Sequence, residues 1–286
     1  MTLAVARNPL ATNVADRLLA TAGSLGIAVR AVDMASLAVS IGPGGEALVA
    51  DRSGPVQAGS VAPYLLFGYP AAVHALRVLS WTARMQNPVD SVLLADDKAA
   101  TAGRLAKAGV AQVATEICPA DLPQVRAAAD RLGYPVVLKR THGARGMWVR
   151  RAGGPDALAA AFGELMADGP GALVIQPEVT ECAGRSVRAV ITGGGLLAAT
   201  ERTAGAGEWR SNIAGGAAQS PAGLTAQELA LADSAVTALG LRHAGVDILR
   251  TARGPRVLEV NSCPDFTSMQ PCFGFDLAAA VLRACV

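Results

Sequence analysis

The chain has 286 residues, of which 51% are hydrophobic and 17% are charged, and its formal net charge is +2. Such a length suits one large domain or two to three small ones, and the weak charge argues against a broad attraction to nucleic acid or membrane surfaces. Five Cys without a Cys-x-x-Cys pair favour free thiols in a reducing compartment, and three widely separated His disfavour a zinc site.

The first residues contain no basic segment followed by a long apolar core, and no uncharged run approaches the ~20 residues of a membrane span. We therefore expect a cytoplasmic protein with neither a membrane nor a nucleic-acid partner.

Residues 1–90 are expected to form a small α/β domain. The patterns predict strands at 3–6 and 27–32, an apolar run at 64–68, helices at 13–25 and 74–86, and a hairpin or loop at 41–59. No Gly-x-Gly-x-x-Gly follows the first strand, and no Gly-x4-Gly-Lys-Ser/Thr occurs. A nicotinamide-binding Rossmann domain and a P-loop ATPase are therefore disfavoured.

Residues 91–175 are expected to form a second domain. Asp96 or Asp97 can cap a helix that ends at Gly109, and Gly133-Tyr-Pro135 ends another. The predicted elements are helices up to 108, at 121–132 and at 155–167, and strands at 136–139, 147–151 and 172–176.

Residues 176–286 are expected to form a third domain. Strands at 187–191 and 196–202 flank Gly193-Gly-Gly195 as a hairpin. Thr225-Ala-Gln-Glu228 is a capping-box pattern that begins a helix extending to 239. A second hairpin is predicted from 244–250 and 256–262, and a closing helix at 276–284.

The second hairpin carries the most informative residues. Folding it about Arg253 places Asp247 opposite Glu259, because each lies six residues from that centre, and Asn261 shares their face. Two opposed acids repel each other, whereas oxygen ligands gathered on one face suit a hard cation such as Mg²⁺. A solvated face with two chance acids is the alternative.

Two lysines are candidate phosphate contacts. Lys139 ends an apolar strand before a loop that contains Gly143 and Gly146, whose backbone can approach the same oxygens as the ammonium. Lys98 lies in the first turn of the helix after Asp97. Taken singly, a solvated lysine beside a β-turn and a surface helix lysine also explain them.

Three arginines and a short hinge complete the pattern. Arg188, Arg202 and Arg210 would offset the acids and can clamp phosphate or carboxylate, with solvation at strand ends as the alternative. The hinge follows a strand, and its extended backbone can hydrogen-bond an adenine edge, although the residues taken alone favour a domain linker. Its residues are Gln176, Pro177, Glu178 and Val179.

In this order the features resemble the ATP-grasp ligases, and among them the RimK/LysX branch of amino-acid ligases. The most specific likeness runs from Arg210-Ser211-Asn212 to Glu259-Val-Asn261-Ser262. The resemblance covers roughly 91–286, and residues 1–90 resemble the family's N-terminal domain only in length and order.

The resemblance implies an α+β protein with the ATP-grasp fold, an N-terminal α/β pre-ATP-grasp domain and ATP held between two sheets. It implies two Mg²⁺ ions, with Mn²⁺ as an alternative, held by Asp247, Glu259 and Asn261. Catalytic contacts to the γ-phosphate and acyl phosphate fall to Arg188, Arg202 and Arg210. The implied nucleotide contacts are Lys98, Lys139, Gly143, Gly146, Gln176, Pro177, Glu178, Val179, Ser186, Arg210, Ser211 and Asn212.

The sequence also departs from the family pattern. Ser186 stands where an acid is usual beside the strand arginine, and Ala214 rather than Arg precedes Gly215-Gly216. Pro264-Asp-Phe266 resembles LysX at its Phe and RimK at its Pro. These departures put one nucleotide contact in doubt and point to a different acceptor.

The implied reaction is ADP-forming carboxylate–amine ligation through an acyl phosphate. Glutamate or another amino acid would be added to a small molecule or coenzyme. Two alternatives remain open: addition of glutamate to a ribosomal or carrier-protein tail, and nucleotide binding without catalysis. A homo-oligomer is expected from the resemblance alone.

Overall fold

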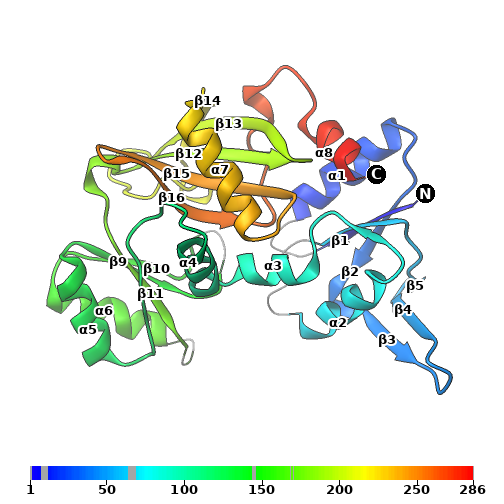
Figure 1. Cartoon of the computed structure of the whole chain (residues 1–286), viewed down its shortest axis with the longest axis horizontal. Coiled ribbons are helices and arrows are strands. Elements are labelled where there is room, and N and C mark those ends of the chain that lie inside the picture. Colours follow the sequence, from blue (N-terminus) through cyan, green and yellow to red (C-terminus); the bar gives the residue numbers. More distant parts are fainter. Residues whose placement is uncertain are drawn as a thin grey trace.

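The computed structural model describes residues 2–7, 12–63, 69–143, 146–167, 169 and 171–285. The apolar run predicted at 64–68 lies outside these residues. Helices and strands build an α+β architecture in which three larger sheets follow one another along the chain (Figure 1). A small three-stranded sheet accompanies the first of them.

The first sheet is parallel, with the order β2-β1-β6-β7. Its strands are β1 (Leu3–Arg7), β2 (Val29–Asp33), β6 (Ser60–Ala62) and β7 (Arg84–Met85). The accompanying helices are α1 (Thr12–Ser24) and α2 (Pro70–Leu79), and the small sheet is β3 (Ala38–Ile41), β4 (Ala47–Asp51) and β5 (Gly54–Pro55). The hairpin predicted at 41–59 is thus present, but the helix predicted at 74–86 was too long because the chain enters β7.

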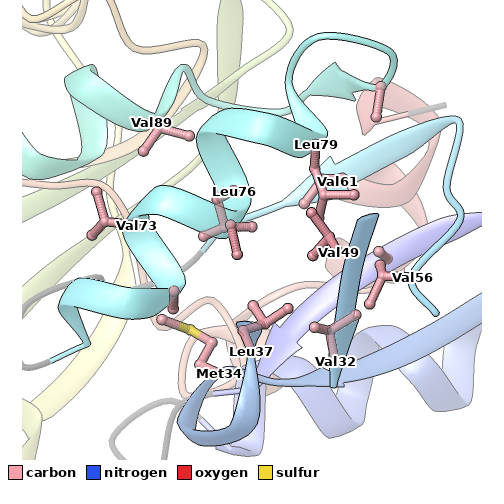
Figure 2. Close-up of a cluster of buried hydrophobic side chains, with 14 of the residues drawn as sticks. Val32, Met34, Leu37, Val49, Val56, Val61, Val73, Leu76, Leu79 and Val89 are labelled. Carbon is pink, nitrogen blue, oxygen red and sulfur yellow. The ribbon is translucent and has the colours of Figure 1, made fainter. Parts of the chain in front are cut away.

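Figure 2 shows the core that joins these elements. Leu76 of α2 lies among Val32 of β2, Val49 of β4 and Val61 of β6, and all are nearly inaccessible to solvent. Burial of such side chains stabilises each by roughly 1.5–3 kcal/mol.

Helices α3 (Val89–Asp96) and α4 (Lys98–Lys107) lead from this sheet toward the rest of the molecule (Figure 1). The sequence patterns missed α3. They did predict the cap of α4, because the Asp97 carboxylate accepts hydrogen bonds from the backbone N–H groups of Ala99 and Ala100 at 2.8 and 3.1 Å. This cap places Lys98 at the first residue of α4.

The second sheet is antiparallel, with the order β10-β9-β11-β8. Its strands are β8 (Glu116–Cys118), β9 (Val136–Arg140), β10 (Val149–Ala152) and β11 (Leu173–Pro177), with helices α5 (Leu122–Leu132) and α6 (Pro155–Met166). Both helices pack on one face, against Leu138 and Leu173. Because strand residues alternate between faces, Lys139 and Gln176 lie on the other face.

The third sheet is antiparallel, with the order β14-β13-β12-β15-β16. Its strands are β12 (Arg185–Thr192), β13 (Gly195–Thr203), β14 (Ala218–Pro221), β15 (His243–Thr251) and β16 (Gly254–Asn261). Helix α7 (Ala226–Ala238) packs on one face, and its capping box at Thr225 and Glu228 is confirmed. Helix α8 (Leu277–Cys285) packs against α1, which ties the C-terminal segment to the N-terminal sheet (Figure 1).

The predicted boundary at 90/91 falls within α3, and the one at 175/176 falls within β11. The division into three domains stays a prediction. Within the described part of the chain, no helix has the length and apolar character needed to cross a bilayer.

Candidate active site

The second and third sheets enclose a cavity of about 440 Å³ that strands β9, β11, β12, β13, β15 and β16 help to line. Every residue that the sequence analysis singled out as a site residue lines this cavity. They are Lys98, Lys139, Gly143, Gly146, Gln176, Pro177, Glu178, Val179, Ser186, Arg188, Arg202, Arg210, Ser211, Asn212, Asp247, Glu259 and Asn261. The structure therefore brings the whole set together, and their individual roles stay predictions.

The predicted pairing of Asp247 with Glu259 is confirmed. Its derivation from a centre at Arg253 was wrong, because the turn is tighter: Thr251 pairs with Gly254. A β-bulge at Leu258 then adds one residue to β16 and restores the pairing that a centre at Arg253 would give.

The bulge decides which way Glu259 faces. Without it, Glu259 would stand opposite Val246, on the face that packs against α7. With it, Val257 and Val260 are both buried in that core, at 2% exposure each, while Glu259 lines the cavity. An irregularity in β16 thus delivers a carboxylate to the site.

Asp247 is buried and already paired. Arg188 donates to it from Nε and from Nη2, the latter at 2.6 Å, and Arg202 Nη1 lies 3.5 Å from Oδ1. Burial alone would raise the pKa of Asp247, but Arg188 and then Arg202 hold it below its ordinary value. A cation at Asp247 would therefore compete with Arg188 for its oxygens.

Asp247, Glu259 and Asn261 offer an oxygen donor set. The Asn261 Nδ2 atom is buried and has no hydrogen-bond partner among the described residues. Within the same part of the chain, no three His, Cys, Asp or Glu side chains form a group that could hold a metal ion. Two carboxylates and an amide fit Mg²⁺ bound together with phosphate oxygens, which is its usual manner of binding in proteins.

The two lysines differ in their surroundings. Lys98 Nζ donates to the Gly143 carbonyl at 2.9 Å and lies 3.7 Å from Glu259 Oε1. Lys139 is buried, and no carboxylate among the described residues lies within 4 Å of its Nζ. Burial, aided by Lys98, lowers the pKa of Lys139 to about 8 against the opposing attraction of Glu259 and Asp247.

Arg202 is a second buried cation whose charge the neighbouring carboxylates only partly neutralise. Burial and then Arg188 lower its pKa to about 10, against the attraction of Asp247. Among the described lining residues, seven Lys or Arg face only four Asp or Glu. The cavity thus concentrates positive charge and suits a polyanionic ligand.

The glycine-containing loop meets the segment at 210–212. A Cβ at Gly146, whose φ is +74°, would lie 2.9 Å from Asn212 Nδ2 and 3.7 Å from Arg210 Nη1. Glycine at this position therefore allows the two segments to approach each other across the cavity.

Two of the predicted nucleotide contacts are engaged elsewhere in the protein. Arg210 Nη2 lies 2.9 Å from Glu208 Oε2, and hydrogen bonds from Arg210 lower the pKa of Glu208 to about 2. Arg151 Nε lies 2.5 Å from Glu178 Oε2. A phosphate or adenine contact by either side chain therefore requires it to exchange partners.

Two of the predicted residues contact each other: Ser186 Oγ and Ser211 Oγ lie 2.6 Å apart, which joins β12 to the 210–212 segment. Sequence reasoning missed some other lining residues. Asn13 of α1 also lines the cavity, with Asp265 and Ser268 of the loop after β16. Asp265 stood in the noted Pro-Asp-Phe segment, but no local pattern signals a contact between residues that lie 252 positions apart.

Comparisons with known proteins agree with this architecture. A family model described as RimK-like ATP-grasp domain matches residues 95–285. A probable alpha-L-glutamate ligase of Pectobacterium carotovorum is 38% identical over 53% of this chain and 50% of its own length. A ribosomal protein bS6–L-glutamate ligase of Salmonella paratyphi B is 36% identical over the same shares.

Solved structures match nearly the whole chain. A RimK domain ATP-grasp protein from Sphaerobacter thermophilus has a TM-score of 0.73 at 22% identity and covers 100% of both chains. The D-cycloserine synthetase DcsG has a TM-score of 0.72 at 23% identity, covering 99% of this chain and 98% of its own. These likenesses show the fold.

Helices and sheets arranged in this way around one cavity define an ATP-grasp protein. This chain belongs to the RimK-like ATP-grasp family. The match spans 50% of the length of the Pectobacterium carotovorum and Salmonella paratyphi B relatives.

Proposed function

We propose that this chain is an ATP-dependent carboxylate–amine ligase. A substrate carboxylate attacks the γ-phosphate of ATP, ADP leaves, and an amine displaces phosphate from the acyl phosphate to form an amide. Glutamate or another amino acid is the proposed amine, and a small molecule or coenzyme is the proposed acceptor. The names of relatives that are glutamate ligases support the amino acid.

One observation carries the proposal. The three oxygen donors Asp247, Glu259 and Asn261 share a cavity with the buried, incompletely compensated cations Lys139 and Arg202. A triphosphate with bound Mg²⁺ would fit both groups of side chains, because the carboxylate and amide oxygens can bind the metal and the two cations can bind phosphate oxygens.

The chain's own residues act mainly by positioning and by neutralising charge. Lys98 and Lys139 lie along the α- and β-phosphates. Asp247, Glu259 and Asn261 would hold Mg²⁺, proposed as two ions with Mn²⁺ as an alternative, and the metal would supply neutralisation of phosphate charge. Arg188 and Arg202, where they exchange Asp247 for substrate, would hold the oxygens of the γ-phosphate and of the carbonyl under attack.

Access of water must be limited, because water hydrolyses an acyl phosphate. The contact between Gly146 and the 210–212 segment supports closure of the glycine loop over the nucleotide. Arg210, once it leaves Glu208, is the third arginine at the reacting end.

A second candidate function is addition of glutamate to a protein or peptide. It is favoured by the relative that is named a ribosomal protein ligase and by the ATP-grasp ligase PsnB, solved with a precursor peptide at a TM-score of 0.72 and 18% identity. The cavity volume of about 440 Å³ is within the range typical of small-molecule sites and suits the nucleotide that both candidates require. Cytoplasmic location and homo-oligomerisation stay predictions.

The test is incubation of the purified protein with ATP, Mg²⁺, isotope-labelled glutamate and cell extract, followed by mass spectrometry. Label on a small molecule supports the first candidate and label on a protein supports the second. A Glu259→Ala protein serves as the inactive control. If no amino acid or extract stimulates ADP release, the ligase proposal fails and the non-catalytic alternative stands.

A further inference from the structure

One corner of the cavity combines the N-terminal and C-terminal parts of the chain. Asn13 and Val14 of α1 line it together with Asp265 and Ser268. The loop that carries Asp265 is anchored by Phe266, which is 1% exposed in the core shared by α1 and α8. The corner therefore has a fixed wall.

The two oxygens of Asp265 have different surroundings. Oδ1 accepts hydrogen bonds from Asn13 Nδ2 at 3.1 Å, from Thr267 N at 3.1 Å, from Thr267 Oγ1 at 2.5 Å and from Ser268 N at 3.3 Å. Among the described residues, none donates to Oδ2. The carboxylate is thus held by one oxygen and retains full accepting capacity on the other.

Asp265 shares the cavity with the two arginines that the proposed function places at the acyl phosphate. Its negative charge attracts both Arg188 and Arg202, which line the same cavity. A cationic group that binds at Oδ2 would therefore lie near the arginines to which the proposed function assigns the acyl phosphate.

We propose that Asp265 binds the ammonium group of the amine substrate through Oδ2, and that Asn13 positions the carboxylate for it. This inference rests on the proposed ligase function and adds the chemical class of the group that is recognised: a primary ammonium, as in an amino acid. It also assigns to α1, outside the family match at 95–285, a part in selecting the amine.

A purely structural role for Asp265 makes a different prediction. The turn with Thr267 and Ser268 uses only Oδ1, and an asparagine carbonyl can accept the same hydrogen bonds. Asp265→Asn therefore keeps the turn and removes the charge at Oδ2. It should affect amine binding only if Oδ2 contacts the amine.

The experiment is calorimetric titration of the full chain, saturated with Mg²⁺ and the non-hydrolysable analogue AMPPNP, with each of the proteinogenic amino acids. We expect at least one to bind to the wild-type protein, and its Kd to rise about tenfold to a hundredfold in D265N, as for loss of a hydrogen bond to a charged group. The deaminated analogue of that amino acid should bind equally to both proteins. The Kd of AMPPNP should stay unchanged.

Asp276→Asn is the matched control, because Asp276 lies outside the cavity lining. Its carboxylate accepts hydrogen bonds from the Ala278 and Ala279 N–H groups at the start of α8 and pairs with Arg17. Unchanged amino-acid binding in D265N, or no amino-acid binding by the nucleotide-loaded wild type, overturns the inference. Failure of the wild type to bind AMPPNP overturns the proposed function instead. If D265N does not fold, Asn13→Ala is the second variant, because the N–H groups of Thr267 and Ser268 still donate to Asp265 Oδ1. Amino-acid binding should weaken about threefold in N13A. Unchanged binding in N13A overturns the inference.

Discussion

Arg188 of β12 and Asp247 of β15 stand directly opposite each other and form a buried ion pair with two hydrogen bonds. A buried carboxylate without a partner is strongly unfavourable, so this pair stabilises the sheet while no cation is bound. The same oxygens are the proposed metal ligands. Metal binding and release of Arg188 are therefore expected to be coupled.

Replacement of Arg188 by Met should expose this coupling. The variant leaves Asp247 buried with only the longer contact to Arg202, so we expect a loss of about 3 kcal/mol in the free energy of unfolding. Mg²⁺ without nucleotide should restore part of that loss, and should change the wild type little. Thermal unfolding with and without Mg²⁺ measures both effects.

Arg185→Met is the control, because Arg185 is an exposed residue of the same strand that pairs with Glu201. It should cost less than about 1 kcal/mol and show no response to Mg²⁺. An R188M protein as stable as the wild type, or one indifferent to Mg²⁺, would argue against the exchange.

The bulge at Leu258 yields a second prediction. Deletion of Leu258 should remove the bulge, leave Val257 opposite Ile248 and Glu259 opposite Asp247, and keep Glu259 facing the cavity. Insertion of one Ala between Leu258 and Glu259 should instead move Glu259 opposite Val246, into the α7 core. We expect the deletion protein to retain the rise in unfolding temperature that Mg²⁺ and AMPPNP give to the wild type, and the insertion protein to lose it. A similar response from both variants would contradict the role of this register.

Glu259→Gln should abolish turnover while leaving the fold intact. The carboxylate lines the cavity and its side chain is 34% exposed, so the core does not depend on its charge. We expect ADP release to fall by about 10³-fold, the scale seen when one preorganised electrostatic group is removed, with an unchanged circular dichroism spectrum. Glu164→Gln, on the exposed face of α6, should have normal activity. Near-normal turnover in E259Q would exclude the metal role.

Local signals explain which elements the sequence predicted. The capping box at Thr225 and Glu228 and the cap at Asp97 are encoded within four residues, and both form as expected. Helix α3 follows Pro88 without a strong amphipathic pattern, and the three-residue strand β8 pairs only with the distant β11, so neither carried a readable local signal. These elements depend on tertiary contacts.

The site residues also divide into those with a local sequence signal and those that depend on tertiary contacts. The predicted acids, lysines and arginines lie on strands, at the start of helix α4 or in loops that follow strands, and all of them line one cavity. The pairing of Asp247 with Glu259 was obtained from a wrong turn centre, because a bulge cannot be read from alternation alone. The contact of Asn13 with Asp265 arises only when α1 packs against the C-terminal loop, which no pattern within either segment encodes.

Lys139 illustrates a cost of function that stability measurements can reveal. Its pKa of about 8, against an ordinary value of 10.5, corresponds to about 3 kcal/mol of unfavourable burial of the charged form. Lys139→Met should therefore raise the free energy of unfolding of the ligand-free protein by roughly 1–3 kcal/mol. The same variant should lose the stabilisation by Mg²⁺ and AMPPNP, because methionine has no ammonium group to bind the phosphates.

The pH dependence of this gain has a definite sign. Below pH 8 the lysine is charged in both the folded and the unfolded state, and the full penalty is present. Between about pH 8 and 10.5 the unfolded state binds more protons than the folded state, so the wild type gains stability relative to K139M as pH rises. Denaturant unfolding across this range should show the difference shrinking. Lys107→Met, at the exposed end of α4, should give no such trend, and a constant difference for K139M would mean that Lys139 is not buried as a charged group.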